Sequence, residues 1–367
     1  MHLPAASEPD PRASFRLLVN GMFFVALPIV VLLPFLIEAY HRGGLGYDFE
    51  QFMLPAARAV AAGGSPYPAY EYPPLVAFAL VPFTVLPGPN IVYTLLLIAC
   101  VPASLWFLGI RDWRCYGVVF LWPPVLAGLQ TGNVTIPLLL GSAICWRYRD
   151  RWRPVAVAGG LAVAAKLLCA PLVIWLAATR RFAAAAGVCV VAGGVSLVLW
   201  AALGFSGFRE YPTNMGNIAR IVSPESYTLK VLLEDVGVGP GPARLIWGLV
   251  AAAVVAAAVG FGLRGDDRRS FALAVTAMIA AIPIIWLHSF LLLVAPVAVM
   301  RPRLGITWLL PLLVVFAPGT GNGTPWQTGG LLGISALTVV LALLPSRSRP
   351  AGPTPDPAWP ARTVTSG

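Results

Sequence analysis

Charged residues are scarce in this chain of 367 residues. Asp, Glu, Lys and Arg together make up 11% of the sequence, whereas hydrophobic residues make up 58%. Soluble domains contain about 25% charged residues, so a chain of this size with so little charge cannot cover a soluble surface. The mean hydropathy of +0.79 points the same way. The shortage excludes an ordinary soluble enzyme and predicts an all-α polytopic membrane protein whose residues mostly face lipid or other helices.

Cysteine and histidine are also rare. The five Cys residues form no CxxC motif and no Cys/His pattern of zinc ligands, and most of them lie within apolar runs,. We therefore expect buried structural thiols rather than a disulfide framework. With only three His in the chain, a His-rich metal site is excluded.

Acidic residues number 15 against 25 Lys and Arg, which gives a formal net charge of +10. In a soluble protein this balance would suggest a nucleic-acid partner. Here the Arg residues gather in short segments between apolar runs, as in cytoplasmic loops under the positive-inside rule, so we expect no nucleic-acid partner. These segments are 146–153, 179–181, 264–269, 301–303 and 346–349. Alternation then places the loops 205–243 and 319–329 on the outer side.

Long apolar runs are what the sequence has in abundance. The first, 17–37, is too long for the apolar core of a signal peptide and long enough to span a bilayer,. Further runs follow as far as 344, so we expect a single domain over 15–345 with about 10–12 transmembrane helices. The ends, 1–14 and 346–367, are rich in Pro, Ser and Arg and are predicted to be disordered and cytoplasmic,.

Two runs do not fit simple alternation. The run 154–178 has Arg clusters at both ends, with Lys166 and Pro171 near its middle. A hairpin broken near Lys166 would return both ends to the cytoplasm, whereas a single tilted span would not. The second conflict concerns Arg111 and Arg114. The positive-inside rule places them in the cytoplasm, whereas counting spans from an outer Asp48 places them outside. The two agree if one of the runs 72–87 and 90–110 is re-entrant.

The loop after the first span is the strongest candidate for a catalytic site. This first outer loop, 38–71, holds Glu38, Asp48, Glu50 and Glu71, although the chain has few acids to place. Residues 48–62 have the pattern of a short amphipathic helix at the membrane surface. A carboxylate fixed there could act as a general base on a bound hydroxyl, while the alternative is an ordinary solvated acid.

Other polar positions interrupt the apolar runs. The amides of Gln130 and Asn133 could bind sugar hydroxyls or simply cap helices. Lys166 is the only charge in its run and could bind a lipid phosphate, since an ionisable group in a span needs a partner. Arg220 and Lys230 in the 205–243 loop are similar candidates, or else solvated charges.

His288 lies beside Trp286 at the outer end of an apolar run. Its imidazole could bind a phosphate or a sugar, or could serve only as an interfacial aromatic group.

In their order and spacing these motifs resemble glycosyltransferase family 87, a group of polyprenol-phosphate-mannose-dependent α-mannosyltransferases within the C superfamily. The resemblance extends over residues 15–300. The motifs that carry it are Asp48, GGSPY (63–67), YPPL (72–75), GLQTGN (128–133), AGGLAVAAKLLCAP (158–171) with Arg180 and Arg181, and finally Pro283, Trp286 and His288.

The resemblance implies a GT-C fold, with two short interfacial helices in the first outer loop and Asp48 as general base. The donor would be a polyprenyl-phosphate sugar, and attack opposite a β-linked donor would give an α-linked product on a glycolipid or cell-envelope glycan. No metal or other cofactor is implied, because basic side chains meet the leaving phosphate. The residues implied for the donor are Lys166, His288, Arg220, Lys230, Gln130 and Asn133, and those for the acceptor loop are Glu50, Tyr67, Glu71 and Tyr72.

Two departures leave the sugar open. Ile282 replaces the more usual Ser before Pro283, and Ser289 replaces an aromatic residue after His288. An arabinofuranosyltransferase using polyprenyl-phosphate arabinose is therefore an alternative. A lipid or sugar transporter is a second alternative, but it should show inverted repeats with paired broken spans, and the sequence shows no repeat. We expect a multi-pass protein of the cytoplasmic membrane with its active site on the outer face.

Overall fold

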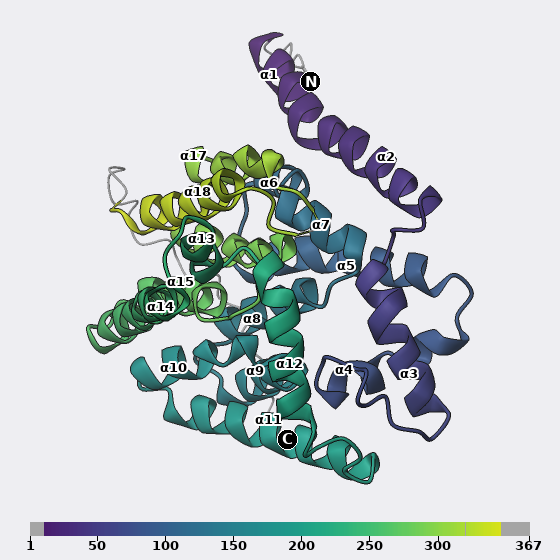
Figure 1. The fold of residues 1–367 in the computed structure, drawn as a ribbon. Coiled ribbons are helices and arrows are strands. Elements are labelled where there is room, and N and C mark those ends of the chain that lie inside the picture. Colours follow the sequence, from purple (N-terminus) through teal and green to yellow (C-terminus); the bar gives the residue numbers. More distant parts are fainter. Residues whose placement is uncertain (1–10, 320, 346–367) are drawn as a thin grey trace, which may run out of the picture.

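The computed structural model describes residues 11–319 and 321–345, and over these residues the chain is helical without any strand (Figure 1). This confirms the all-α class. Residues 1–10 and 346–367, most of the two ends predicted to be disordered, lie outside the described residues. The first helix, α1, begins at Pro11.

Five helices within the described ranges are long and apolar enough to cross a membrane, or six if one bent pair is counted as a span. They are α1–η1–α2 (crossing over Ser14–His41), α5 (Pro89–Phe107), α11 (Phe182–Ala202), α14 (Pro240–Leu263) and α18 (Pro325–Leu343), and the bent pair is α7 (Pro123–Thr131) with α8 (Thr135–Arg147). This number is below the 10–12 expected, because several apolar runs are broken into shorter helices. Proline, which cannot continue the helical hydrogen-bond ladder, begins many of these pieces.

The remaining elements are short. The other α-helices are α3 (Leu54–Ala61), α4 (Pro74–Ala79), α6 (Trp113–Phe120), α9 (Trp152–Ala165), α10 (Pro171–Ala178), α12 (Tyr211–Val222), α13 (Leu229–Asp235), α15 (Asp267–Ala280), α16 (Val294–Met300) and α17 (Ile306–Leu309). The 3-10 and π segments are η1 (Met22–Ala26), η2 (Phe49–Met53), η3 (Val81–Val85), η4 (Leu167–Cys169), η5 (Ser223–Glu225), η6 (Leu287–Leu293) and η7 (Leu310–Phe316). Of the two short helices expected in the first outer loop, 38–71, η2–α3 forms one, whereas α4 begins after that loop, at Pro74.

The run 154–178 is a hairpin broken at Lys166, as one of the two readings predicted. Helix α9 ends at Ala165, and Lys166 is extended (φ −158°, ψ 120°) before η4 and α10 turn back. A helix of 14 residues is roughly 21 Å long, well short of the ~30 Å apolar core of a bilayer,. The two ends of the hairpin meet, because Arg181 pairs with Asp150 over 2.9 Å.

Of the two apolar runs between 72 and 114, only one forms a helix long enough to span a membrane. The run 72–87 forms only α4 and η3, whereas α5 has the length of a span. After α5, the carboxylate of Asp112 pairs with Arg114 over 2.9 Å and accepts a hydrogen bond from the backbone N–H of Leu304 over 3.0 Å. The link after α5 therefore lies at the same end of the bundle as the basic link 301–303.

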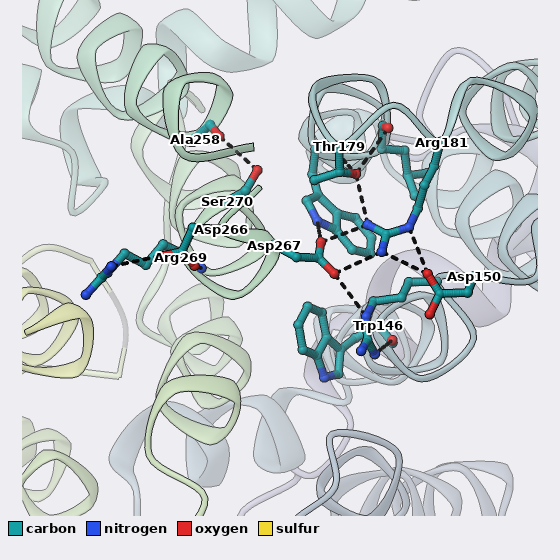
Figure 2. A network of polar contacts seen from close by, with 12 residues as sticks. Trp146, Asp150, Thr179, Arg181, Ala258, Asp266, Asp267, Arg269 and Ser270 are labelled. Carbon is teal, nitrogen blue, oxygen red and sulfur yellow. Dashed lines mark hydrogen bonds and ion pairs between the residues drawn. The ribbon is translucent and has the colours of Figure 1, made fainter. Parts of the chain in front are cut away.

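The basic links gather at one end of the molecule, which we call the arginine end. Figure 2 shows the network that joins three of them: the Asp267 carboxylate accepts from Trp175 Nε1 (2.8 Å) and Arg181 Nη1 (2.8 Å) and pairs with Arg149 Nε (2.9 Å). At the same end Arg269 donates to the carbonyl of Leu343. These contacts fix the start of α15 against the ends of α8 and α10.

Close helix crossings depend on glycine. A Cβ on Gly160 of α9 would lie 2.5 Å from Cβ of Val191 on α11, and one on Gly159 would lie 2.8 Å from Cγ2 of Val188. Small residues let two membrane helices approach to this distance. The first span is packed differently: α1–α2 projects from the bundle in Figure 1, and most of its side chains are exposed, as expected for a helix surrounded by lipid.

Candidate active site

Asp48 lies where the first loop turns back toward the bundle. Helix α2 ends at His41, and the chain then turns through Gly46 (φ +75°) to reach η2. The N–H of Gly46 donates to the carbonyl of Gln130 over 2.6 Å, which ties this turn to the end of α7. Asp48 is therefore placed by a contact between segments that are distant in the sequence.

Asn133 fixes the side chain of Asp48. Its Nδ2 donates to Oδ2 of Asp48 over 2.6 Å. Its Oδ1 accepts from both the backbone N–H (2.9 Å) and the hydroxyl (2.6 Å) of Thr135. Because both donors must meet the amide oxygen, the NH₂ group can only point at the carboxylate. Asn133 is only 2% exposed, so it holds the Asp48 carboxylate from the buried side of the site.

Gly132 makes this approach possible. It has a left-handed conformation (φ +67°), and a Cβ there would lie 3.1 Å from both Cα of Gly46 and Cβ of Phe49. Phe49 in turn stacks on Tyr93 of α5 with ring centroids 4.5 Å apart. Glycine is the residue that satisfies both the backbone angle and the contact.

Two carboxylates and one ammonium group share the site. Burial raises the pKa of Asp48, while the hydrogen bond from Asn133 and the charge of Lys166 act in the opposite direction. Burial also raises the pKa of Glu71, and the nearby Asp48 carboxylate adds to this effect against the charge of Lys166. A carboxylate with a raised pKa is a stronger proton acceptor, which is what a general base requires.

Lys166 reaches this cluster from the tip of the broken hairpin. Its Nζ lies 5.7 Å from the centre of the Tyr72 ring. Among the described residues it forms no ion pair within 4.0 Å. The helix break thus places the half-buried ammonium group of Lys166 at the site with no carboxylate paired to it. Lys166 is therefore able to bind an anionic group.

Three buried polar atoms near the cluster have no hydrogen-bond partner within the described part of the chain: Nε2 of His288, Oγ1 of Thr131 and the hydroxyl of Tyr70. Thr131 lies close enough to Asp48 for its hydroxyl to lower the pKa of that carboxylate, the charge of Lys166 acts on His288, and Tyr70 precedes Glu71 in the sequence. Buried polar atoms are normally satisfied, and unsatisfied ones next to a catalytic candidate indicate positions where a substrate hydroxyl can bind. Sequence reasoning missed Tyr70 and Thr131, although both lie inside or beside the quoted motifs.

Tyr67 holds the first loop to the bundle. Its ring stacks on Trp200 with centroids 4.6 Å apart, and its hydroxyl donates to the carbonyl of Tyr72 over 2.8 Å. The hydroxyl of Tyr211 donates to the carbonyl of Glu71 over 3.2 Å. These bonds fix the backbone on either side of Glu71, so Tyr67 is positioned as a support for the loop.

Other candidates lie away from the cluster or at its edge. Arg220 is exposed on α12 and bonds to Asn217 over 2.6 Å, and Lys230 pairs with Glu234 over 3.1 Å on α13. Neither has a contact with Asp48. The side chain of Gln130 adjoins Gly44, and Glu50 is half-buried in η2 next to the turn. No group of three or more His, Cys, Asp or Glu among the described residues could hold a metal ion.

Comparison with known proteins identifies the family. The profile of glycosyltransferase family 87 matches residues 70–296. The chain belongs to glycosyltransferase family 87. The match includes Glu71, Asn133, Lys166 and His288, while Asp48 precedes it, so the assignment of Asp48 depends on its geometry. The family-87 chain is accordingly a multi-pass membrane glycosyltransferase.

A relative from Mycolicibacterium smegmatis is 27% identical over 346 aligned residues, which cover 83% of this chain and 74% of the relative. That protein is a polyprenol-phosphate-mannose-dependent alpha-(1-2)-phosphatidylinositol mannoside mannosyltransferase. No solved structure matches this chain.

Proposed function

We propose that this glycosyltransferase moves mannose from polyprenyl-phosphate-mannose to a hydroxyl of a membrane glycolipid, with Asp48 as general base. The observation that carries the proposal is the Asp48 carboxylate, held by Asn133 over 2.6 Å and adjoined by the unneutralised Lys166. The Mycolicibacterium relative, which uses such a donor and a phosphatidylinositol mannoside, supports the sugar and the class of acceptor.

The reaction assigns each group one task. Asp48 takes the proton from the acceptor hydroxyl as the oxygen attacks C1 of the sugar. The bond from C1 to the phosphate oxygen breaks, and polyprenyl phosphate leaves with that electron pair. Lys166 stabilises the negative charge that develops on this phosphate. Attack from the opposite face converts a β-linked donor into an α-linked product.

The unsatisfied polar atoms supply the sugar contacts. His288, Thr131 and Tyr70 each present a buried donor or acceptor that finds no protein partner in the described ranges. We assign them to hydroxyls of the transferred sugar, while Glu71 and Tyr72 border the acceptor side. This arrangement needs no nucleotide sugar and no metal.

The reaction is assigned to the outer face of the cytoplasmic membrane. Helices α5 and α8 each begin beside the Asp48 cluster and end at the arginine end, so Asp48 lies away from that end. There the basic links 146–153, 179–181, 264–269 and 301–303 are joined by contacts. Under the positive-inside rule the arginine end stays in the cytoplasm, so Asp48 faces the other side.

The experiment is transfer by purified protein from radiolabelled polyprenyl-phosphate-mannose to an extract of membrane glycolipids, with polyprenyl-phosphate-arabinose as the competing donor. Asp48→Asn should lose about 10²–10⁴-fold in turnover, the contribution of a positioned base. The matched control is Glu225→Gln, an exposed acid outside the cluster, which should keep wild-type turnover. Turnover of Asp48→Asn within a few-fold of wild type would remove Asp48 as the base, and transfer of arabinose alone would replace mannose as the sugar.

A further inference from the structure

A hollow of about 480 Å³ opens at the arginine end, and its lining residues are distant in sequence from Asp48. One wall comes from Trp146 at the end of α8 and from Arg149, which follows the helix. The other wall comes from the link between α14 and α15, residues 264–268. The site described above uses none of these residues.

The carboxylates that line the hollow are already neutralised. Asp267 binds the guanidinium groups of Arg149 and Arg181, and Asp266 pairs with Arg269 over 2.7 Å. Figure 2 shows Asp267 directed into this network rather than outward. These two carboxylates are therefore not free to neutralise any other arginine that lines the hollow.

Arg264 and Arg268 supply that charge. Both are exposed, and neither forms a hydrogen bond or an ion pair through its side chain with any residue in the described ranges. They flank the opening together with Arg149, whose guanidinium lies over the Trp146 ring at 4.4 Å. The lining thus carries a net positive charge with two guanidinium groups able to take an anion.

The position of the hollow indicates which anion it meets. Arg264 directly follows α14, a spanning helix whose last residue, Leu263, is 61% exposed and faces lipid. The hollow therefore lies where a membrane helix leaves the apolar core, at the depth of phospholipid phosphates. Basic pockets between helices at this depth bind the headgroups of acidic lipids.

We propose that this hollow binds the phosphate headgroup of an anionic phospholipid from the surrounding leaflet. Arg264 and Arg268 hold the phosphate, Trp146 and Arg149 form the inner wall, and the acyl chains extend along α14. Free inorganic phosphate has the same binding chemistry, so the experiment must separate the two sources.

The test measures the melting temperature of the full-length protein in neutral detergent during titration with phosphatidylglycerol, phosphatidylcholine or inorganic phosphate. Phosphatidylglycerol should raise the melting temperature saturably, and the other two should not at matched concentrations. In the double variant R264Q/R268Q the half-saturating phosphatidylglycerol concentration should rise by at least about 25-fold, because the loss of charged hydrogen bonds to the phosphate costs about fivefold or more per arginine. Both residues are exposed and make no internal bonds, so the lipid-free variant should melt near wild type.

The matched control is R153Q/R303Q, which removes the same charge from exposed positions at the arginine end outside the hollow. It should leave the half-saturating concentration within about threefold, since surface charge alone acts weakly. An equal loss in both double variants, or equal stabilisation by phosphatidylcholine, would overturn the site. Stabilisation by inorganic phosphate that R264Q/R268Q abolishes would overturn the lipid as its occupant.

Discussion

Replacing Asn133 by Leu tests how the proposed base is held. Leu has the same number and branching of side-chain heavy atoms as Asn, although its methyl groups are bulkier, and it cannot donate the 2.6 Å hydrogen bond to Asp48. A hydrogen bond to an ionised carboxylate contributes about 1.5–3 kcal/mol. This bond lowers the pKa of Asp48 against the effect of burial, so its loss favours the protonated form.

Loss of this hydrogen bond should lower the activity at acidic pH. Protonated Asp48 cannot accept the proton of the acceptor hydroxyl, so activity falls as the pH drops through its pKa. At about 1.4 kcal/mol per pH unit, the acidic limb of the kcat/KM profile should move upward by ~1–2 pH units. The plateau above that limb should also fall by about tenfold, because the carboxylate is no longer fixed in orientation.

The assay is the pH dependence of mannose transfer by purified variants, together with their melting temperatures. Thr135→Val is the control, because Oδ1 of Asn133 keeps the backbone N–H of residue 135 as a donor. The acidic limb of the kcat/KM profile of Thr135→Val should move by less than about half a pH unit, as expected for loss of one hydrogen bond between neutral groups. A folded Asn133→Leu variant with a wild-type limb and plateau would refute the role assigned to Asn133.

Lys166→Met should raise the Michaelis constant for the lipid-linked donor and move the acidic limb upward, because the lysine charge lowers the pKa of the base; an unchanged constant would contradict the phosphate role. Gly132→Ala should destabilise the protein by about 1–3 kcal/mol because of its positive φ and 3.1 Å contacts,. Gly193→Ala on α11, with open space around it, should instead melt near wild type, and equal melting of both would count against the close approach. On a Cys-free background, Cys at Ser65 should react with a membrane-impermeant thiol reagent in intact cells and Cys at Asp150 should not, and the reverse pattern would invert the assigned topology.

The sequence by itself determined the class of protein, because composition alone rules out a soluble surface. It also determined the broken hairpin as one of two readings. Arg clusters at both ends of a 25-residue apolar run and a lysine near its middle already limit how the run can lie in a membrane,. The short helix after Asp48 was predicted as 48–62 and is observed as Phe49–Ala61, since local amphipathicity and the following Gly63 define it.

Only the tertiary structure decided what depends on contacts between distant segments. Periodicity could not show that 72–87 is the run that stays short, because its hydropathy resembles that of a span. Asn133 and Asp48 are 85 residues apart, and their bond depends on the backbone approach that Gly132 permits. The sequence offered Asn133 as a sugar ligand or a helix cap, and its burial and its hydrogen bond to Asp48 add the role of orienting the carboxylate.

The same reason separates Lys166 from Arg220 and Lys230. All three were candidates for the donor phosphate because residue type is all that a sequence supplies. Folding brings Lys166 to the carboxylates without neutralising it, leaves Arg220 exposed on α12, and pairs Lys230 with Glu234. Which cation remains available beside Asp48 is set by the packing of the hairpin, and packing is a property of the whole chain.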